Sequence, residues 1–124
     1  MNKQILLIED NEQNRYLTTY LLTRRGYGVI EAVDGKSGIE MAVKGGIDLI
    51  LLDIQLPEMD GYDVAAALRA DARTREVPII AVTSYAMVGD REKALASGCN
   101  GYIEKPINPD TFVSEIERFL PAGG

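Results

Sequence analysis

Residues 47–61 read Ile-Asp-Leu-Ile-Leu-Leu-Asp-Ile-Gln-Leu-Pro-Glu-Met-Asp-Gly, and this stretch decides the fold class. The unbroken apolar run Leu49–Leu52 is typical of a strand that is buried on both faces of a parallel sheet. The run stops at the carboxylate of Asp53, and Pro57 and Gly61 keep the following chain irregular. Ligands of open α/β sheets bind outside the carboxyl ends of the strands, so Asp53 is a candidate site residue. An isolated Asp at such a place more commonly starts a turn, so the rest of the chain has to decide.

The composition restricts the function classes. A chain of 124 residues is one domain of ordinary size that needs neither a disulfide nor a structural metal to fold. The net charge of −6 and the lack of a basic cluster argue against a nucleic-acid-binding surface. Without His, and with Cys99 as the single cysteine, the chain offers no zinc site, and we expect Cys99 to be a buried thiol. The apolar run Ile5–Ile8 is too short for a signal peptide or a membrane span, so we expect a cytoplasmic protein.

Five strand-like runs alternate with five helix-like segments. The predicted strands are residues 5–8, 28–32, 47–53, 78–82 and 101–104. The predicted helices are about 13–25, about 35–44, one that begins after Asp60, one within 87–97, and one that begins at Asn108-Pro109 and is ended by Pro121. This alternation predicts an α/β fold with a doubly wound parallel sheet and helices on both faces.

Helical spacing of apolar residues predicts which face of each helix is buried. Asp34 and Asp60 are predicted to cap the second and third helices. In the first helix Leu17, Tyr20, Leu21 and Arg24 stand at helical spacing, with Leu17 and Leu21 expected in the core and Arg24-Arg25 expected as a charge pair at the helix end. The expected inner faces of the other helices are Ile39, Ala42 and Val43 in the second, Val64, Ala67 and Leu68 in the third, and Phe112, Val113, Ile116, Phe119 and Leu120 in the last.

Polar residues stand where the predicted strands end. Glu9 and Asp10 follow the first strand, Asp53 ends the third, Thr83 follows the fourth and Lys105 follows the fifth. All strands are parallel, so these residues share one edge of the sheet. If the first and third strands are neighbours, about 4.8 Å apart, their carboxylates converge and repel one another. Lys105 supplies one compensating charge, and Mg²⁺ suits the remaining oxygen ligands.

This pattern resembles the receiver domain of two-component response regulators. The resemblance covers Lys3 to Leu120 and rests on Glu9-Asp10, residues 53–61, Thr83 and Tyr102-Ile103-Glu104-Lys105-Pro106. Residues 85–90 are most similar to stand-alone receivers of the cell-polarity type and to receivers attached to hybrid kinases. The resemblance implies a flavodoxin-like five-stranded sheet in the order 2-1-3-4-5. We expect residues 1–124 to form a single receiver domain with no output domain after the last helix, so that the domain either acts through binding or is one part of a larger protein.

The resemblance also implies roles for individual residues. Asp53 would accept a phosphoryl group from a histidine kinase or a histidine phosphotransfer protein. Mg²⁺ would be held by the carboxylates of Asp10 and Asp53 and by the backbone carbonyl of Gln55, while Glu9 would assist through water. Lys105 would pair with the phosphoryl oxygens.

A second group of implied roles concerns signalling. Thr83 would hydrogen-bond the phosphoryl group. We predict that Thr83 and Tyr102 relay its presence to a protein-binding surface made by the fourth helix, fifth strand and fifth helix. Tyr102 lies three residues before Lys105, so its ring should point to the opposite face of the strand, near the fourth helix. Gln55 and Tyr85 would tune the lifetime of the phosphoryl group. The Lys105–Pro106 bond is expected to be cis. Such a protein is a phosphoacceptor switch that assists its own phosphorylation and dephosphorylation, and not an enzyme with turnover.

Four alternatives compete with this interpretation. A phosphatase of the haloacid dehalogenase type also uses an aspartyl nucleophile after a strand, but Gln55 stands where its second acid is needed and the chain has no room for a cap domain. A phosphorylation-independent binding module would not need the complete set of Asp10, Asp53, Thr83 and Lys105. The segment Gly35-Lys36-Ser37 is not a P-loop, because residue 30 is Ile, and Gly26-Tyr27-Gly28 lacks the third glycine of a dinucleotide fingerprint.

Overall fold

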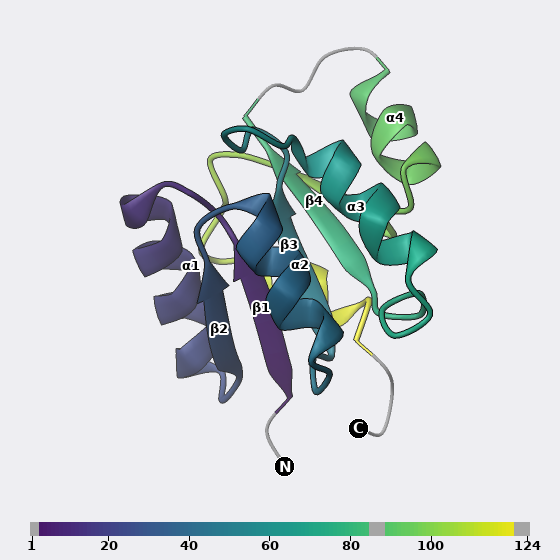
Figure 1. Ribbon diagram of the computed structural model, residues 1–124. Coiled ribbons are helices and arrows are strands. Elements are labelled where there is room, and N and C mark those ends of the chain that lie inside the picture. The colour runs from purple at the N-terminus through teal and green to yellow at the C-terminus, as the bar shows by residue number, and fades with distance from the viewer. Residues whose placement is uncertain (1–2, 85–88, 121–124) are drawn as a thin grey trace.

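Five parallel strands form one sheet in the order β2-β1-β3-β4-β5, as the resemblance implied (Figure 1). The computed structural model describes residues 3–84 and 89–120 of the chain. The strands are β1 (Gln4–Ile8), β2 (Gly28–Ala32), β3 (Leu49–Asp53), β4 (Ile79–Thr83) and β5 (Gly101–Glu104). All five residues of β3 are buried, which confirms the prediction for the central apolar run. The fourth strand begins one residue later than predicted, at Ile79, and includes Thr83.

Helices cover both faces of the sheet. They are α1 (Glu12–Arg24), α2 (Gly35–Val43), α3 (Gly61–Ala70), α4 (Asp90–Ala96) and α5 (Phe112–Glu117). In Figure 1, α2 and α3 lie in front of the sheet, and the yellow α5 is seen behind it. Alternate residues of each strand point to opposite faces, so Leu6 of β1 packs with α2, α3 and α4, whereas Leu7 packs with α1 and α5.

Carboxylate and amide side chains cap the first three helices. The side chain of Asn11 accepts from the backbone N–H of Asn14, that of Asp34 from Ser37, and that of Asp60 from Asp63, at 2.8, 2.8 and 3.0 Å. The predicted caps Asp34 and Asp60 are thus confirmed. At Gly61 a Cβ would lie 2.6 Å from the Cα of Ile54, so only glycine lets α3 start against the end of β3.

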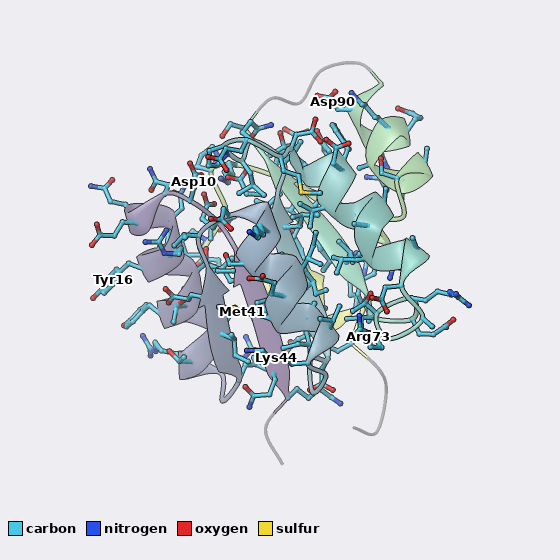
Figure 2. All side chains as sticks on the ribbon, viewed as in Figure 1. Asp10, Tyr16, Met41, Lys44, Arg73 and Asp90 are labelled. Carbon is cyan, nitrogen blue, oxygen red and sulfur yellow. The ribbon has the colours of Figure 1, made fainter. Side chains whose placement is uncertain are left out.

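The predicted inner face of α1 is wrong by one position. Leu17 and Tyr20 are exposed, at 38% and 46%, while Thr18 and Leu22 are buried. Leu21 is only partly buried, because the helix turns Leu22 of the Leu21-Leu22 pair toward the sheet. Thr18 and Leu22 are four residues apart, so they share one face of the helix. Figure 2 shows Tyr16 on α1 pointing away from the sheet.

The other inner faces are closer to prediction. In α2, Ala42 is buried, while Ile39 and Val43 are partly buried. In α3, Val64 and Leu68 are buried as predicted, but Ala65 is buried where Ala67 was expected, and Ala67 is partly buried.

The last helix is shorter than predicted. Asn108 starts a turn, accepting from the backbone N–H of Asp110 on its side chain and from that of Phe112 on its carbonyl, and the α-helix itself begins only at Phe112. The helix ends at Glu117, before Pro121. Phe112, Val113 and Ile116 are buried as expected, and Phe119 and Leu120 pack beyond the helix end.

Other expectations concern single residues or ranges. The α4 bounds fall within the predicted range, but Tyr85, Met87 and Pro121 lie outside the described residues. Cys99 is a free, buried thiol as predicted, and burial raises its pKa to about 11. Within the described ranges, every helix is too short or too polar to cross a membrane.

Candidate functional site

The predicted acidic residues meet at the carboxyl edge of the sheet. Strands β1 and β3 pair with Ile8 opposite Leu52, so Glu9 and Asp10 leave the sheet beside Asp53. One carboxylate oxygen from each of these three acids lies within 4.8 Å of the other two. Glu9 and Asp53 are buried, whereas Asp10 is exposed at the end of β1 (Figure 2). The predicted convergence of the carboxylates is confirmed.

Lys105 enters this acidic cluster from the end of β5. Its Nζ lies 2.7 Å from Oε1 of Glu9 and 3.4 Å from Oδ1 of Asp53. Its backbone N–H donates to the carbonyl of Thr83 at 2.7 Å, and the Lys105–Pro106 bond is cis, as the resemblance implied. One ammonium group therefore faces three carboxylates, which leaves the cluster with two negative charges in excess when all are ionised.

Glu9 makes three polar contacts with neighbouring residues. Lys105 binds its Oε1, and the backbone N–H of Asn11 donates to its Oε2 at 3.2 Å. Its carbonyl accepts from a guanidinium nitrogen of Arg15 at 2.9 Å. These contacts were not predicted from the sequence, although Asn11 could be noticed as the residue before a helix. Both Glu9 oxygens are engaged and Asp53 is buried, so the exposed Asp10 offers the most accessible oxygens of the cluster.

The buried position of Asp53 shifts its protonation. Burial raises the pKa of Asp53 to about 7, and a hydrogen bond to Glu9 and repulsion from Glu9 add to this increase. Lys105 and the backbone N–H of Gln55, which donates to Oδ1 of Asp53 at 3.0 Å, partly oppose it. A further cation near the carboxylates would favour the ionised form.

The side chain of Gln55 connects the end of β3 with the end of β4. Its Nε2 donates to Oγ1 of the buried Thr83 at 2.6 Å, and its Oε1 accepts from the backbone N–H of Ser84 at 3.1 Å. From the sequence, Gln55 was expected only to provide a backbone ligand and to tune the lifetime of the phosphoryl group. No periodicity could have revealed this contact, because it joins the loop after β3 to the last residue of β4, 28 residues away.

Tyr102 lies on the opposite side of β5 from Ile103. Its ring packs against the α2, α3 and α4 face of the core, while Ile103 packs on the α1 and α5 face. The Tyr102 hydroxyl is buried and has no hydrogen-bond partner within residues 3–84 and 89–120. The predicted placement of the ring near the fourth helix is confirmed.

The donor set fits a hard divalent cation. The three converging groups are all carboxylates, and Mg²⁺ prefers oxygen ligands while it retains several waters. The exposed carboxylate of Asp10 leaves one side of the cluster open to solvent. A cavity of about 80 Å³, whose lining includes Glu9, Asp53 and Lys105, lies beside the acids.

Comparisons with known proteins agree with this geometry. Residues 5–117 match the family described as "Response regulator receiver domain". The polar-differentiation response regulator DivK of Brucella ovis is 41% identical over 120 residues, which cover 97% of this chain and 98% of DivK.

Two solved structures are similar as well. One is the receiver domain of the sensor histidine kinase PA1611 from Pseudomonas aeruginosa, which is described with a magnesium ion coordinated in the active site cleft. It is 37% identical, has a TM-score of 0.87, and the match covers 95% of this chain and 97% of that one. The other is the receiver domain of the response regulator Ssk1 in complex with the histidine phosphotransfer protein Ypd1 of Saccharomyces cerevisiae. It is 28% identical, with a TM-score of 0.89 and coverage of 96% and 89%.

Proposed function

The chain belongs to the response regulator receiver family, and we propose that Asp53 is the residue on which it accepts the phosphoryl group. The observation that carries this assignment is the position of Asp53 at the end of the central strand, within 4.8 Å of two further carboxylates and 3.4 Å from the ammonium of Lys105. Asp53 also accepts from the backbone N–H of Gln55, whose side chain donates to Thr83 at the end of β4.

The chemistry requires an ionised Asp53. One of its oxygens forms a bond to phosphorus while the bond from phosphorus to the donor histidine nitrogen breaks. Phosphoryl transfer depends mainly on positioning and on neutralisation of the phosphoryl oxygens, which Lys105 supports from its place beside Asp53. When bound, Mg²⁺ would supply further neutralisation. The carboxylates of Asp10 and Asp53 and the backbone carbonyl of Gln55 would hold it, and Glu9, engaged by Lys105, would act through water.

The phosphodonor is a histidine kinase or a histidine phosphotransfer protein. The similarity to the Ssk1 receiver, which is described in complex with Ypd1, supports a phosphotransfer protein, and the similarity to the PA1611 receiver supports a kinase. We place this exchange in the cytoplasm, where such donors present their histidines. The protein acts as a switch and not as an enzyme with turnover.

The downstream partner binds the face formed by α4, β5 and α5. A groove of about 400 Å³ lies on this face, and its lining has both signs of charge and two aromatic rings. Its lining includes Arg91, Tyr102, Glu104, Glu115, Arg118 and Phe119. Tyr102 therefore belongs both to the core beside α4 and to this groove, so a change that starts at Thr83 can reach a partner through it.

Phosphorylation of variants tests the acceptor assignment. With acetyl phosphate and Mg²⁺, intact-mass analysis should detect one acid-labile phosphoryl group on the unmodified protein and none on Asp53→Asn. Asp60→Asn is the matched control, because Asn also caps helices well and Asp60 lies outside the acidic cluster. Undiminished labelling of Asp53→Asn would contradict the assignment.

A turnover assay separates the switch from an aspartyl phosphatase. With phosphomonoesters and Mg²⁺, the switch should release no more than about one equivalent of phosphate. Steady multiple turnover that is lost in Asp53→Asn would favour the phosphatase.

A further inference from the structure

The side-chain amide of Gln55 binds two consecutive residues at the end of β4. Its Nε2 donates to Oγ1 of Thr83 at 2.6 Å, and its Oε1 accepts from the backbone N–H of Ser84 at 3.1 Å. The backbone N–H of the same residue donates to Oδ1 of Asp53 at 3.0 Å. Gln55 thus contacts the proposed phosphoacceptor through its main chain and Thr83 through its side chain.

The chemistry of the partners determines the direction of these hydrogen bonds. The backbone N–H of Ser84 can only donate, so the amide oxygen of Gln55 must face it. The amide nitrogen then faces Thr83, and it also can only donate. The Thr83 oxygen is therefore the acceptor in this contact, and its own proton cannot point toward Gln55. The Ser84 N–H, the Gln55 amide and the Thr83 hydroxyl thus form a chain of hydrogen bonds that run in the same direction, from Ser84 through Gln55 to Thr83. Hydrogen bonds arranged in this way strengthen one another.

We infer that Gln55 is a positioning residue that presents the Thr83 hydroxyl as a hydrogen-bond donor to a phosphoryl group on Asp53. This inference rests on the function proposed above. A phosphoryl oxygen is an anionic acceptor and needs a donor. An unrestrained hydroxyl can turn either its proton or a lone pair toward a neighbour. The amide of Gln55 occupies a lone pair of Thr83, which directs the proton to an acceptor other than Gln55.

The substitution Gln55→Glu tests this polarity with little change in size. A carboxylate still accepts from Ser84 N–H, but it cannot donate to Thr83. The Thr83 proton should then turn toward Glu and leave a lone pair for the phosphoryl site. We expect the affinity for beryllofluoride, a phosphoryl mimic, to fall about tenfold or more in the presence of Mg²⁺, as measured by NMR titration.

A double-mutant cycle removes the effect of the added negative charge. In the Thr83→Val background there is no hydroxyl that Gln55→Glu could turn the wrong way. The loss of affinity caused by Gln55→Glu should therefore be at least threefold smaller than with Thr83 present. A threefold difference corresponds to a coupling energy of roughly 0.6 kcal/mol, which is about the smallest that such a cycle resolves. Thr83→Ser keeps the hydroxyl and should restore the full effect. Equal fold-changes with Thr83 present and in the Thr83→Val background would overturn the inference and leave the assignment of Asp53 intact.

Failure of the proposed function looks different. If the unsubstituted protein does not bind beryllofluoride, and Asp53→Asn behaves identically, the acceptor assignment itself is contradicted. If Gln55→Glu does not fold, judged by circular dichroism, Gln55→Met replaces it in the same cycle. Met has a similar length but no hydrogen-bonding amide, so it should weaken binding about threefold with Thr83 present and not measurably with Thr83→Val.

A spectroscopic measurement separates positioning from a merely structural role. The side-chain NH₂ resonances of Gln55 should shift in the free Thr83→Val protein, and they should shift again when beryllofluoride binds to the unsubstituted protein. NH₂ resonances that ignore beryllofluoride, while the backbone signals of Asp53 respond, would contradict the inference.

Discussion

Two cations at opposite ends of β4 and β5 have contrasting partners. Lys105 follows β5 at the carboxyl edge of the sheet and faces the carboxylates of Glu9 and Asp53. Arg69, in the last turn of α3, lies at the amino edge, where it binds the residues that precede the same two strands, among them Val77 and Asn100. Both residues are partly buried, yet only one of them stands in a region with unbalanced charge.

The Arg69 guanidinium donates to a set of neutral oxygens. Its Nε binds the carbonyl of Gly98 at 2.8 Å, one terminal nitrogen binds three carbonyls of the α3–β4 connection, and the other binds Oδ1 of Asn100 at 2.7 Å. The same Asn100 oxygen accepts from the N–H of Ile79. These fixed neutral oxygens satisfy the hydrogen-bond donors of the guanidinium without any further ligand. The acidic edge, with three carboxylates and one ammonium, is balanced only when a further cation binds. This difference distinguishes a structural site from a functional one.

Removal of the arginine should have the largest effect on stability. We expect Arg69→Met to lower the free energy of unfolding by about 2–4 kcal/mol, because it leaves four carbonyls, most of them partly buried, without this donor. Urea denaturation measures this change. Phosphorylation by acetyl phosphate should persist under conditions in which the variant is folded.

Lys105→Met is the matched control for Arg69→Met. With saturating Mg²⁺ it should cost less than half as much stability, because the metal compensates the carboxylates, but it should impair phosphorylation or its relay. If Lys105→Met destabilised the fold as strongly as Arg69→Met, the contrast between the two regions would be wrong.

The acidic edge should make stability depend on pH in the metal-free protein. The folded protein retains a proton on Asp53 up to about pH 7, whereas the unfolded chain releases it near pH 4. Between these values the folded state binds more protons, so its stability falls as the pH rises. We expect a decrease of about 1–3 kcal/mol between pH 5 and pH 8 in the presence of chelator, and a smaller decrease in Asp53→Asn.

Magnesium should reverse this trend, since it binds the ionised carboxylates. At ten times its dissociation constant, it should add about 1.4 kcal/mol to the free energy of unfolding at pH 8. Asp10→Asn should reduce that gain. A metal-free protein that gains stability as the pH rises from 5 to 8, with no response to Mg²⁺, would refute this account of the acidic edge.

The smallest effect concerns the tyrosine between the two regions. The Tyr102 hydroxyl is buried without a partner among the described residues, so Tyr102→Phe should raise the free energy of unfolding by up to about 1 kcal/mol. Tyr16→Phe is the control, because Tyr16 is 75% exposed and should have no measurable effect. Thermal denaturation compares the two variants. A destabilised Tyr102→Phe protein would show that the hydroxyl has a partner that supports the fold.

The acidic edge could be predicted from the sequence, whereas the amino edge could not. Strand ends are visible in a sequence, because apolar runs stop at Glu9 and Asp53 and the short fifth strand ends just before Lys105, and parallel topology brings such ends together. Arg69 gave no such signal, since an Arg in the last turn of a helix is an ordinary surface residue. Its role depends on how the α3–β4 connection folds back, which no periodicity encodes.

The helix faces show the same limit. The caps Asp34 and Asp60 follow from local hydrogen bonding, so they were predicted correctly. The rotation of α1 depends on which of two adjacent leucines packs against the sheet, and spacing alone does not decide between Leu21 and Leu22. The side-chain contacts of Gln55 were missed for a similar reason, because they join the loop after β3 to the end of β4.

The central claim is that Asp53 alone carries the phosphoryl group, and reductive trapping tests it most directly. An acyl phosphate on a side chain is converted by borohydride into the corresponding alcohol, which marks the modified position permanently for peptide sequencing by mass spectrometry. After incubation with acetyl phosphate and Mg²⁺, the mark should appear at Asp53 and at neither Glu9 nor Asp10. A mark at Glu9 or Asp10, or an unmarked Asp53 in a protein that gained an acid-labile phosphoryl group, would contradict the account.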